Sequence, residues 1–174
     1  MEARDRITIF VIDDDKMLTM ALKNDIEKTF AQYNAVVSTF EAGEQTSMFI
    51  KNGPDIAIVD YHLNSKNKDA MDGVRIIDMI KKESPDTEVI MFTSEEHAEI
   101  AVKALHHGAH DYVVKNDFMF RKLNMSVMQC IKLKQLKADI RSQKIKTSVL
   151  AVSLVLMAGA LIALQIWAPN VLSK

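Results

Sequence analysis

Five short apolar runs alternate along the chain with longer stretches in which apolar residues recur every three or four positions. Continuous apolar runs are typical of strands buried on both faces, whereas the longer spacing predicts amphipathic helices. The runs cover residues 7–12, 35–40, 56–59, 88–92 and 112–114. An alternation of strand and helix repeated five times predicts an α/β fold, in which one parallel sheet is covered by helices on both faces.

Residues that commonly begin or end helices support this division. Asn52, Gly53 and Pro54 predict the end of a short helix over residues 43–51, Asp72 with Gly73 predicts the start of another, and Gly108 suits the position just after a third. A last helix is expected from Phe118. The apolar stripes of the four longer helices are Leu18, Ala21, Leu22, Ile26 and Phe30; Val74, Ile77 and Ile80; Ala98, Ala101, Val102 and Leu105; and Leu123, Val127 and Ile131.

Four of the five predicted strands end in a side chain that could take part in chemistry. The first is followed by Asp13 and Asp14, the third by Asp60, the fourth by Thr93 and the fifth by Lys115. In an open parallel sheet, ligands bind outside the carboxyl ends of the strands. Carboxylates gathered there would repel one another unless a cation lay among them, and an all-oxygen set of ligands suits Mg²⁺. The sequence therefore predicts a magnesium site at this edge.

The same groups have the chemistry of phosphoryl transfer. A carboxylate can attack phosphorus to form an aspartyl phosphate, and the reaction needs neutralisation of charge more than acid–base help. A lysine ammonium and a threonine hydroxyl would contact the remaining phosphoryl oxygens. Taken singly, each residue has a simpler explanation, because aspartate and threonine often cap helices and lysine is often a solvated surface residue. Their joint occurrence at separate strand ends favours the site.

These residues lie in motifs that resemble the receiver domain of bacterial two-component response regulators. The resemblance covers about residues 5–133. The matching stretches are residues 9–15 (IFVIDDD), 58–60 (IVD), 71–73 (MDG), 91–94 (MFTS) and 108–115 (GAHDYVVK). It implies a flavodoxin-like, doubly wound five-stranded parallel sheet and a protein that accepts phosphate from a sensor histidine kinase or phosphotransfer protein. The resemblance also implies that the protein is not an enzyme with a separate substrate, although such a receiver promotes its own phosphorylation and dephosphorylation.

The resemblance also implies a role for each site residue. Asp60 would be the phosphoacceptor, with Thr93 and Lys115 binding the phosphoryl group. The implied Mg²⁺ ligands are Asp13, Asp14, Asp60 and the backbone carbonyl of His62. Thr93 and Tyr112 would form the switch, and the helix over about residues 95–107, the fifth strand and the last helix would form the face that partners recognise.

The chain departs from the family pattern at two places. Asn116 follows Lys115 where the family usually has proline, and the loop over residues 63–71 is longer than usual and lacks the common proline. His62 and Glu95 stand where the family tunes the lifetime of the phosphate.

His106 and His110 have the i, i+4 spacing of a helical metal site, but Gly108 between them favours surface histidines.

The end of the chain has a different composition. Six basic residues and one acid, Asp139, lie between Lys132 and Lys146, and residues 148–168 are 21 uncharged residues that include Trp167. A helix of that length spans about 30 Å, the hydrocarbon thickness of a bilayer. The sequence predicts a receiver domain (1–133), a basic juxtamembrane helix (134–147), a transmembrane helix (148–168) and a short tail (169–174), with helix discouraged beyond Pro169. A buried core helix and a partner-binding helix are the alternatives.

The remaining composition restricts the function classes. The net charge of −1 gives no support for nucleic-acid binding, and the single cysteine, Cys130, excludes an intramolecular disulfide. Four charges in the first six residues predict no secretory signal, and the basic flank predicts a cytoplasmic receiver anchored in the inner membrane. The expected function is a membrane-anchored phosphoacceptor that contacts lipid and possesses a weak dimerisation motif at Gly159 and Ala163. The alternatives are a phosphorylation-independent adaptor and a phosphate sink.

Overall fold

A computed structural model describes residues 6–41, 53–63 and 72–172, with side chains to residue 163. The helix expected over residues 43–51 and residues 64–71 of the long loop lie outside the described part of the chain. The same holds for the side chain of Trp167. Contacts divide the chain into two units, one up to Ile131 and one from Lys132, so that the division falls two residues before the expected boundary.

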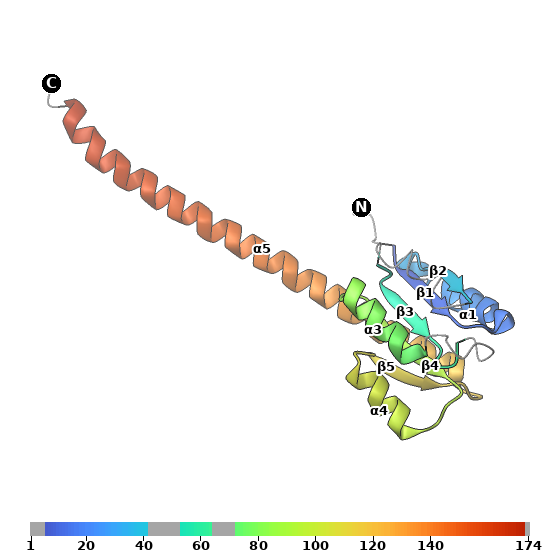
Figure 1. The fold of residues 1–174 in the computed structure, drawn as a ribbon. Coiled ribbons are helices and arrows are strands. Elements are labelled where there is room, and N and C mark those ends of the chain that lie inside the picture. Colours follow the sequence, from blue (N-terminus) through green and yellow to red (C-terminus); the bar gives the residue numbers. More distant parts are fainter. Residues whose placement is uncertain (1–5, 42–52, 64–71, 173–174) are drawn as a thin grey trace. The chain divides into compact units, whose positions relative to one another are not determined.

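The first unit contains the five-stranded parallel sheet that the sequence predicts (Figure 1). Its strand order is β2-β1-β3-β4-β5, the order of a doubly wound flavodoxin-like sheet. The strands are β1 (Thr8–Ile12), β2 (Val36–Phe40), β3 (Ile56–Val59), β4 (Glu88–Thr93) and β5 (Asp111–Val114). The helices are α1 (Lys16–Thr29), the 3₁₀ turn η1 (Ala31–Tyr33), α3 (Gly73–Glu83), α4 (Ala98–His106) and α5 (Met119–Leu172).

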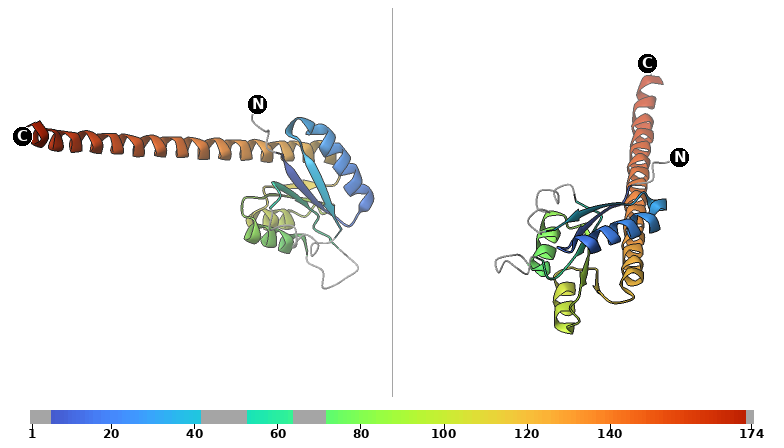
Figure 2. Two further views of the ribbon diagram at one scale, coloured as in Figure 1. Left: turned by 90° about the horizontal axis from the view of Figure 1, so that it is seen from above. Right: turned by 90° about the vertical axis from the view of Figure 1, so that its right-hand side faces the viewer.

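Two apolar clusters lie on opposite faces of this sheet. On one face, α1 and the first turns of α5 pack through residues such as Leu22, Ile26 and Val127, all of them fully buried. On the other face, α3 and α4 pack through residues such as Ile77 and Ala104 (Figure 2). Each buried aliphatic side chain contributes about 1.5–3 kcal/mol relative to an exposed one, so both layers stabilise the sheet. The expected stripes of α3 and α5 are confirmed as core. In the stripe expected on α1, Leu22, Ile26 and Phe30 are buried, whereas Leu18 is half-buried and Ala21 is exposed.

Short-range interactions within the chain define where the helices begin and end. The Asp15 carboxylate caps α1 by accepting hydrogen bonds from the N–H groups of Met17 (2.9 Å) and Leu18 (3.0 Å). The Asp72 carboxylate caps α3 in the same way, through the N–H of Arg75 (2.9 Å). Each cap contributes about 1 kcal/mol. Gly108, which follows α4, has φ of +98°, a conformation that favours glycine.

The stripe expected on α4 is wrong as a core face. Val102 is 67 % exposed and Leu105 is 48 % exposed, whereas Ala104 is the fully buried residue of the helix. The reason is the position of α4, which packs beside β5, the edge strand of the sheet. An edge strand offers little surface to cover, so a narrow contact through small residues suffices. Helical spacing shows which residues share a face but not whether that face is covered.

The end of α5 also differs from expectation. The helix continues through Pro169 to Leu172, although proline was expected to discourage helix beyond that point. The fixed φ of proline, about −65°, is compatible with helix, although its ring removes one backbone hydrogen bond and crowds the carbonyl four residues earlier. Every described side chain from Lys134 to Ala163 is exposed. The helix is long and apolar enough to cross a membrane, and its most apolar window is not buried.

Gly73→Ala is expected to destabilise the first unit by about 1–3 kcal/mol, the usual cost of overpacking. A Cβ at this position would lie 2.8 Å from the Tyr61 Cα and would also meet the carbonyl oxygen of Asp60. Both contacts are with backbone, which cannot yield as a flexible side chain would. Gly159→Ala is the matched control, because its Cβ would meet nothing within 4 Å. Calorimetry of the full chain in detergent would measure both, and equal unfolding temperatures would contradict the expectation.

Candidate functional site

The carboxyl ends of four neighbouring strands converge at one edge of the sheet. Parallel pairing sets Ile12 opposite Val59 in the β1–β3 pair and Thr93 opposite Val114 in the β4–β5 pair. The backbone hydrogen bonds continue one step further, because the Asp60 N–H donates to the Ile12 carbonyl (2.9 Å). The Lys115 N–H likewise donates to the Thr93 carbonyl (2.8 Å). The residues that follow the strands are thereby held side by side.

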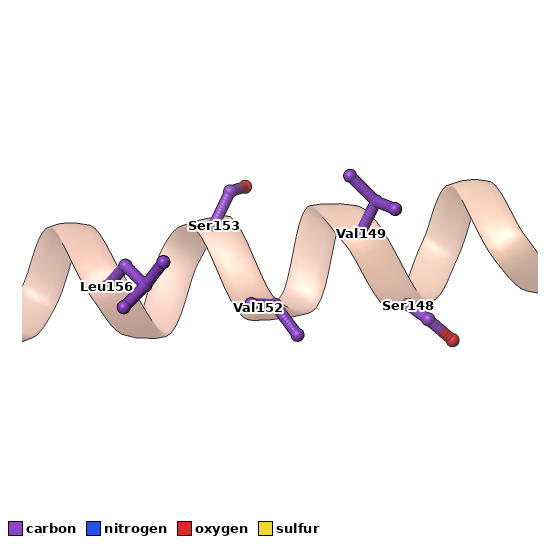
Figure 3. Close-up of a pocket in the computed structure, with 5 residues that line it drawn as sticks. All are labelled: Ser148, Val149, Val152, Ser153 and Leu156. Carbon is purple, nitrogen blue, oxygen red and sulfur yellow. The ribbon is translucent and has the colours of Figure 1, made fainter.

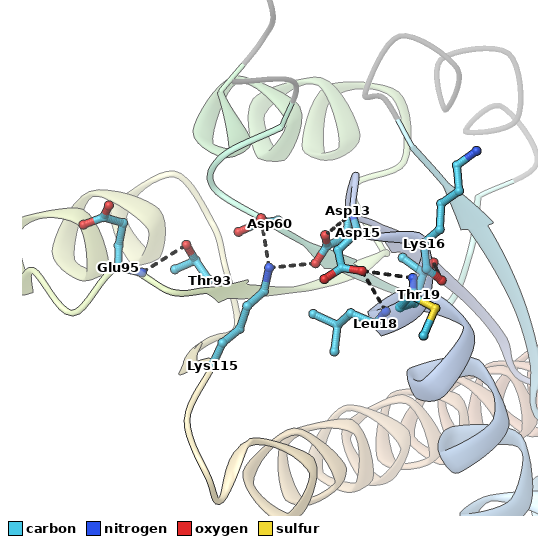
Figure 4. Close-up of polar contacts among 10 residues, drawn as sticks. Asp13, Asp15, Lys16, Leu18, Thr19, Asp60, Thr93, Glu95 and Lys115 are labelled. Atoms are coloured by element: carbon cyan, nitrogen blue, oxygen red, sulfur yellow. Dashed lines mark hydrogen bonds and ion pairs between the residues drawn. The ribbon is translucent and has the colours of Figure 1, made fainter. Parts of the chain in front are cut away.

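Lys115 joins two of the strand ends through its ammonium group. Its Nζ lies 2.7 Å from Asp13 Oδ2 and 2.9 Å from Asp60 Oδ2 (Figure 4). The side chains of all three residues are largely buried, with exposed fractions of 14 %, 2 % and 8 % for Lys115, Asp13 and Asp60. Screening by solvent is weak at such burial, so the ammonium orients both carboxylates.

Asp14 completes an acidic cluster with Asp13 and Asp60. Carboxylate oxygens of the three residues lie within 4.8 Å of one another, and Asp14 is exposed whereas the other two are buried. Within the described part of the chain, Asp60 Oδ1 is buried and has no hydrogen-bond partner. A buried carboxylate oxygen without a partner is costly, and an all-oxygen cluster is the ligand set of a hard divalent cation. The residues present therefore fit Mg²⁺.

Burial and the ion pairs act on the protonation of this cluster in opposite directions. Burial raises the pKa of Asp13 above its usual value, although hydrogen bonds from Lys115 and from the Asp15 N–H lower it in part. Burial by itself would lower the pKa of Lys115, but the hydrogen bonds and charges of Asp13 and Asp60 outweigh it, so that its pKa is raised. Lys115 therefore stays a cation at neutral pH.

Thr93 lies beside the cluster and is fully buried at the end of β4. Its hydroxyl oxygen accepts a hydrogen bond from the Glu95 N–H (3.3 Å), a long and therefore weak contact. Lys115 also lies 5.4 Å from the centre of the Phe92 ring, one residue before Thr93. The structure thus brings together Asp13, Asp14, Asp60 and Lys115, with Thr93 next to them on β4.

Glu95 forms a group of contacts that the sequence analysis missed. Its carboxylate lies 2.7 Å from His62 Nε2 and 3.5 Å from His97 Nε2, and its carbonyl accepts a hydrogen bond from the Tyr112 hydroxyl (2.7 Å). Burial, followed by the charge of Glu95, raises the pKa of Tyr112. The only signal in the sequence was that His62 and Glu95 each lie two residues beyond a predicted site residue. Spacing along the chain does not show that two residues so far apart in sequence contact each other.

Two neighbours of the site have structural roles. Asp15, the third of the consecutive aspartates, caps α1 and lies outside the acidic cluster. Asn116 stands where the family pattern has proline, and its side-chain oxygen accepts a hydrogen bond from the Phe118 N–H (3.1 Å). This local turn leads from β5 into α5 and leaves Lys115 in contact with both carboxylates. Proline is therefore not needed to place the lysine.

Comparison with known proteins agrees with this geometry. Residues 9–127 match the family model of the response regulator receiver domain. The regulatory protein AtoC of Escherichia coli is 32 % identical over 94 residues, which are 54 % of this chain and 19 % of AtoC. A probable C4-dicarboxylate response regulator, DctR of Priestia megaterium, is 25 % identical over 122 residues, which are 70 % of this chain and 50 % of DctR. The chain therefore spans half or less of these relatives.

Solved structures show the same fold. The BeF₃-activated receiver domain of DrrB superposes with a TM-score of 0.60 and 28 % identity, and the match covers 74 % of this chain and 99 % of that domain. A CheY-like receiver domain protein from Methanospirillum hungatei superposes with a TM-score of 0.66 at 21 % identity, over 76 % of this chain and 99 % of the other. In both cases the part of this chain that matches is about the size of a whole receiver domain.

Proposed function

The chain belongs to the response regulator receiver domain family of two-component signalling, and from this premise we propose that Asp60 accepts a phosphoryl group from a phosphohistidine. One observation carries the proposal, namely that Lys115 bridges Asp13 and Asp60 at the centre of an acidic cluster. A buried carboxylate held by an ammonium beside two further acids is the arrangement that an aspartyl phosphate requires.

In the proposed step, a carboxylate oxygen of Asp60 attacks phosphorus. The new O–P bond forms as the N–P bond of the phosphohistidine breaks, and the imidazole leaves with the electron pair. Lys115, whose Nζ lies 2.9 Å from Asp60 Oδ2, is close enough to stabilise charge on the transferred oxygens, and the hydroxyl of Thr93 at the end of β4 would contact them as well. Mg²⁺ held by Asp13, Asp14, Asp60 and the His62 carbonyl would supply further neutralisation of that charge. The protein promotes this transfer but turns over no separate substrate.

The contacts of Glu95 support a route from this step to the surface. Phosphoryl oxygens on Asp60 would compete with the Glu95 N–H for the Thr93 hydroxyl, whose present hydrogen bond is long at 3.3 Å. Movement of Glu95 would in turn disturb its carbonyl contact with the Tyr112 hydroxyl. Tyr112 is half-buried on β5, the edge strand against which α4 packs. Phosphorylation would thereby shift the population of surface conformations, as in other charge-driven switches.

The second unit supports membrane anchoring of this receiver. Residues 148–163 expose apolar side chains, and the Ser153 hydroxyl donates to the Leu150 carbonyl (2.8 Å) of its own helix. The Thr147 hydroxyl likewise donates to the carbonyls of Gln143 and Lys144 (both 3.0 Å). Polar groups satisfied within one helix are compatible with hydrocarbon. The basic residues from Lys132 to Lys146 would lie at the cytoplasmic surface of the membrane, where each contributes about 1 kcal/mol of attraction to anionic lipid.

Phosphorylation of the full chain in lipid nanodiscs tests the proposal. We expect acetyl phosphate with Mg²⁺ to add one phosphoryl group per chain, and peptide mapping to place it on Asp60. The modification should be lost when EDTA removes the metal. Modification at another residue, or none with any phosphodonor that includes a phosphorylated histidine kinase, would contradict the proposal.

Magnesium is expected to stabilise the first unit, because a ligand that binds only the folded state favours it. At a concentration ten times the dissociation constant, the gain is about 1.4 kcal/mol. Asp14→Asn should abolish most of this gain without unfolding the protein, because Asp14 is exposed. Asp15→Asn, which keeps the helix cap outside the cluster, should retain it. Calorimetry with and without Mg²⁺ measures the difference, and an equal gain in both variants would argue against the site.

A further inference from the structure

The polar part of the second unit has an apolar stripe that is largely exposed in the described chain. Leu136 and Ile140 are 59 % and 54 % exposed, and Leu133 one turn earlier is half-buried. These residues lie at intervals of three and four in a stretch that is otherwise mostly basic and polar. Apolar residues with that alternating spacing form the contact seam of coiled coils.

The stripe continues into the apolar segment without a change of spacing. In heptad terms the a positions hold Leu133, Ile140, Thr147, Leu154 and Leu161, and the d positions hold Leu136, Gln143, Leu150 and Met157. Seven of the nine positions are apolar. Seven-residue periodicity over four repeats keeps one seam facing a partner helix, whereas a lone helix in lipid has no need of it.

We propose that α5 pairs with α5 of a second copy of this chain, in parallel, through the stripe from Leu133 to Leu161. The proposal rests on the membrane anchor of the proposed function, because two copies inserted with the same orientation must run parallel. Ile140 at an a position and Leu136 at a d position favour two strands. The polar Gln143 at a d position pairs best with itself, which sets the register.

Charge complementarity supports a second copy as the partner. Asp139, the only acid of the basic run, occupies a g position, and Lys144 occupies the following e position. Five residues apart, they do not face each other on one helix, and neither makes an ion pair in the described part of the chain. In a parallel pair, Asp139 of each copy faces Lys144 of the other. In the same pair, Lys132 of one copy faces Lys137 of the other, and the repulsion between these like charges weakens the pairing.

Two other features of this helix lie on different faces. The small residue Gly159, with open space around it, occupies an f position opposite the stripe. The shallow hollow of Figure 3 is lined by Ser148, Val149, Val152, Ser153 and Leu156. All five residues belong to one helix and none lies at an a or d position, so the hollow is surface relief between side chains. Pairing through Gly159 would expose the stripe, and the two arrangements are therefore distinguishable.

Single cysteines in the full chain, reconstituted in liposomes and oxidised, test the pairing. We expect Leu136→Cys and Ile140→Cys to form disulfide-linked dimers several-fold more than Ala138→Cys and Ser142→Cys, which point away from the stripe. The natural Cys130 supplies little background, because its side chain is buried and burial raises the pKa of its thiol to about 12. Equal cross-linking at all four positions, none at any, or cross-linking confined to Gly159→Cys would overturn the proposal.

A charge exchange in the Leu136→Cys chain tests the partner. Asp139→Lys sets like charges opposite Lys144, and Lys144→Asp sets like charges opposite Asp139, so each should reduce cross-linking several-fold. The double exchange leaves the net charge unchanged and should restore cross-linking. Failure to restore cross-linking would contradict the proposed register. Flotation of the same liposomes reports the anchor separately. Flotation without cross-linking refutes the pairing alone, and cross-linking without flotation supports the pairing while it refutes the anchor.

Discussion

Asp60→Asn is expected to abolish phosphorylation of the chain by acetyl phosphate or by a phosphorylated kinase. The amide cannot act as the attacking oxygen, so the loss should be complete rather than partial. The fold of the variant should persist. The ion pair between Lys115 Nζ and Asp13 Oδ2 (2.7 Å) and the hydrogen bond from the backbone N–H of residue 60 to the Ile12 carbonyl do not depend on the Asp60 carboxylate. Intact-mass measurement of the full chain in nanodiscs, with Mg²⁺ present, gives the extent of modification.

Asp15→Asn is the matched control for that experiment. It makes the same chemical change close to the site, but the side chain caps α1 and asparagine caps helices equally well. Phosphorylation of this variant at the wild-type extent would show that loss in Asp60→Asn is specific. Undiminished labelling of Asp60→Asn would remove Asp60 from the mechanism, whatever the control shows.

Two arginines in the apolar segment are expected to remove the chain from the membrane. Val155 and Leu156 are 72 % and 68 % exposed near the middle of that segment, so Val155→Arg with Leu156→Arg would set two charges in the hydrocarbon. Each costs about 2.5–3.5 kcal/mol at the centre of a membrane helix. The combined cost should shift the chain from the membrane pellet to the soluble fraction or to aggregates after carbonate extraction.

Ala138→Arg with Ser142→Arg controls for the added charge. Both positions are exposed in the basic run, where positive charge suits the cytoplasmic surface of the membrane, so this variant should stay in the pellet. Phosphorylation of Asp60 in detergent should be the same in both variants, because the first unit is unchanged. Full retention of the Val155 and Leu156 variant in the membrane would contradict the span and favour a peripheral helix.

Local patterns along the chain were sufficient for the five strands and for the helices α1, α3, α4 and the start of α5, though not for the 3₁₀ turn η1. Continuous apolar runs such as residues 56–59 identified buried strands, and the spacing of Val74, Ile77 and Ile80 identified the buried face of a helix. Strand–helix alternation then predicted a parallel sheet, whose strand ends must meet at one edge. Asp13, Asp60, Thr93 and Lys115 followed from that topology, because each directly follows or ends a strand.

The tertiary structure decided what depends on contacts between segments distant in sequence. It showed that Lys115 bridges Asp13 and Asp60, that Asp14 is exposed while Asp13 is buried, and that the Asp15 carboxylate caps α1. It paired Glu95 with His62 across 33 residues and left Val102 on the surface of α4.

By itself, then, the sequence determined the strands, most of the helices and the edge at which the candidate site residues gather, because periodicity and strand ends are properties of neighbouring residues. It could not determine which of these side chains touch or which apolar faces are covered. Distances and burial depend on where other elements pack, and for α4 that was the edge strand β5. Only the folded chain supplies those neighbours.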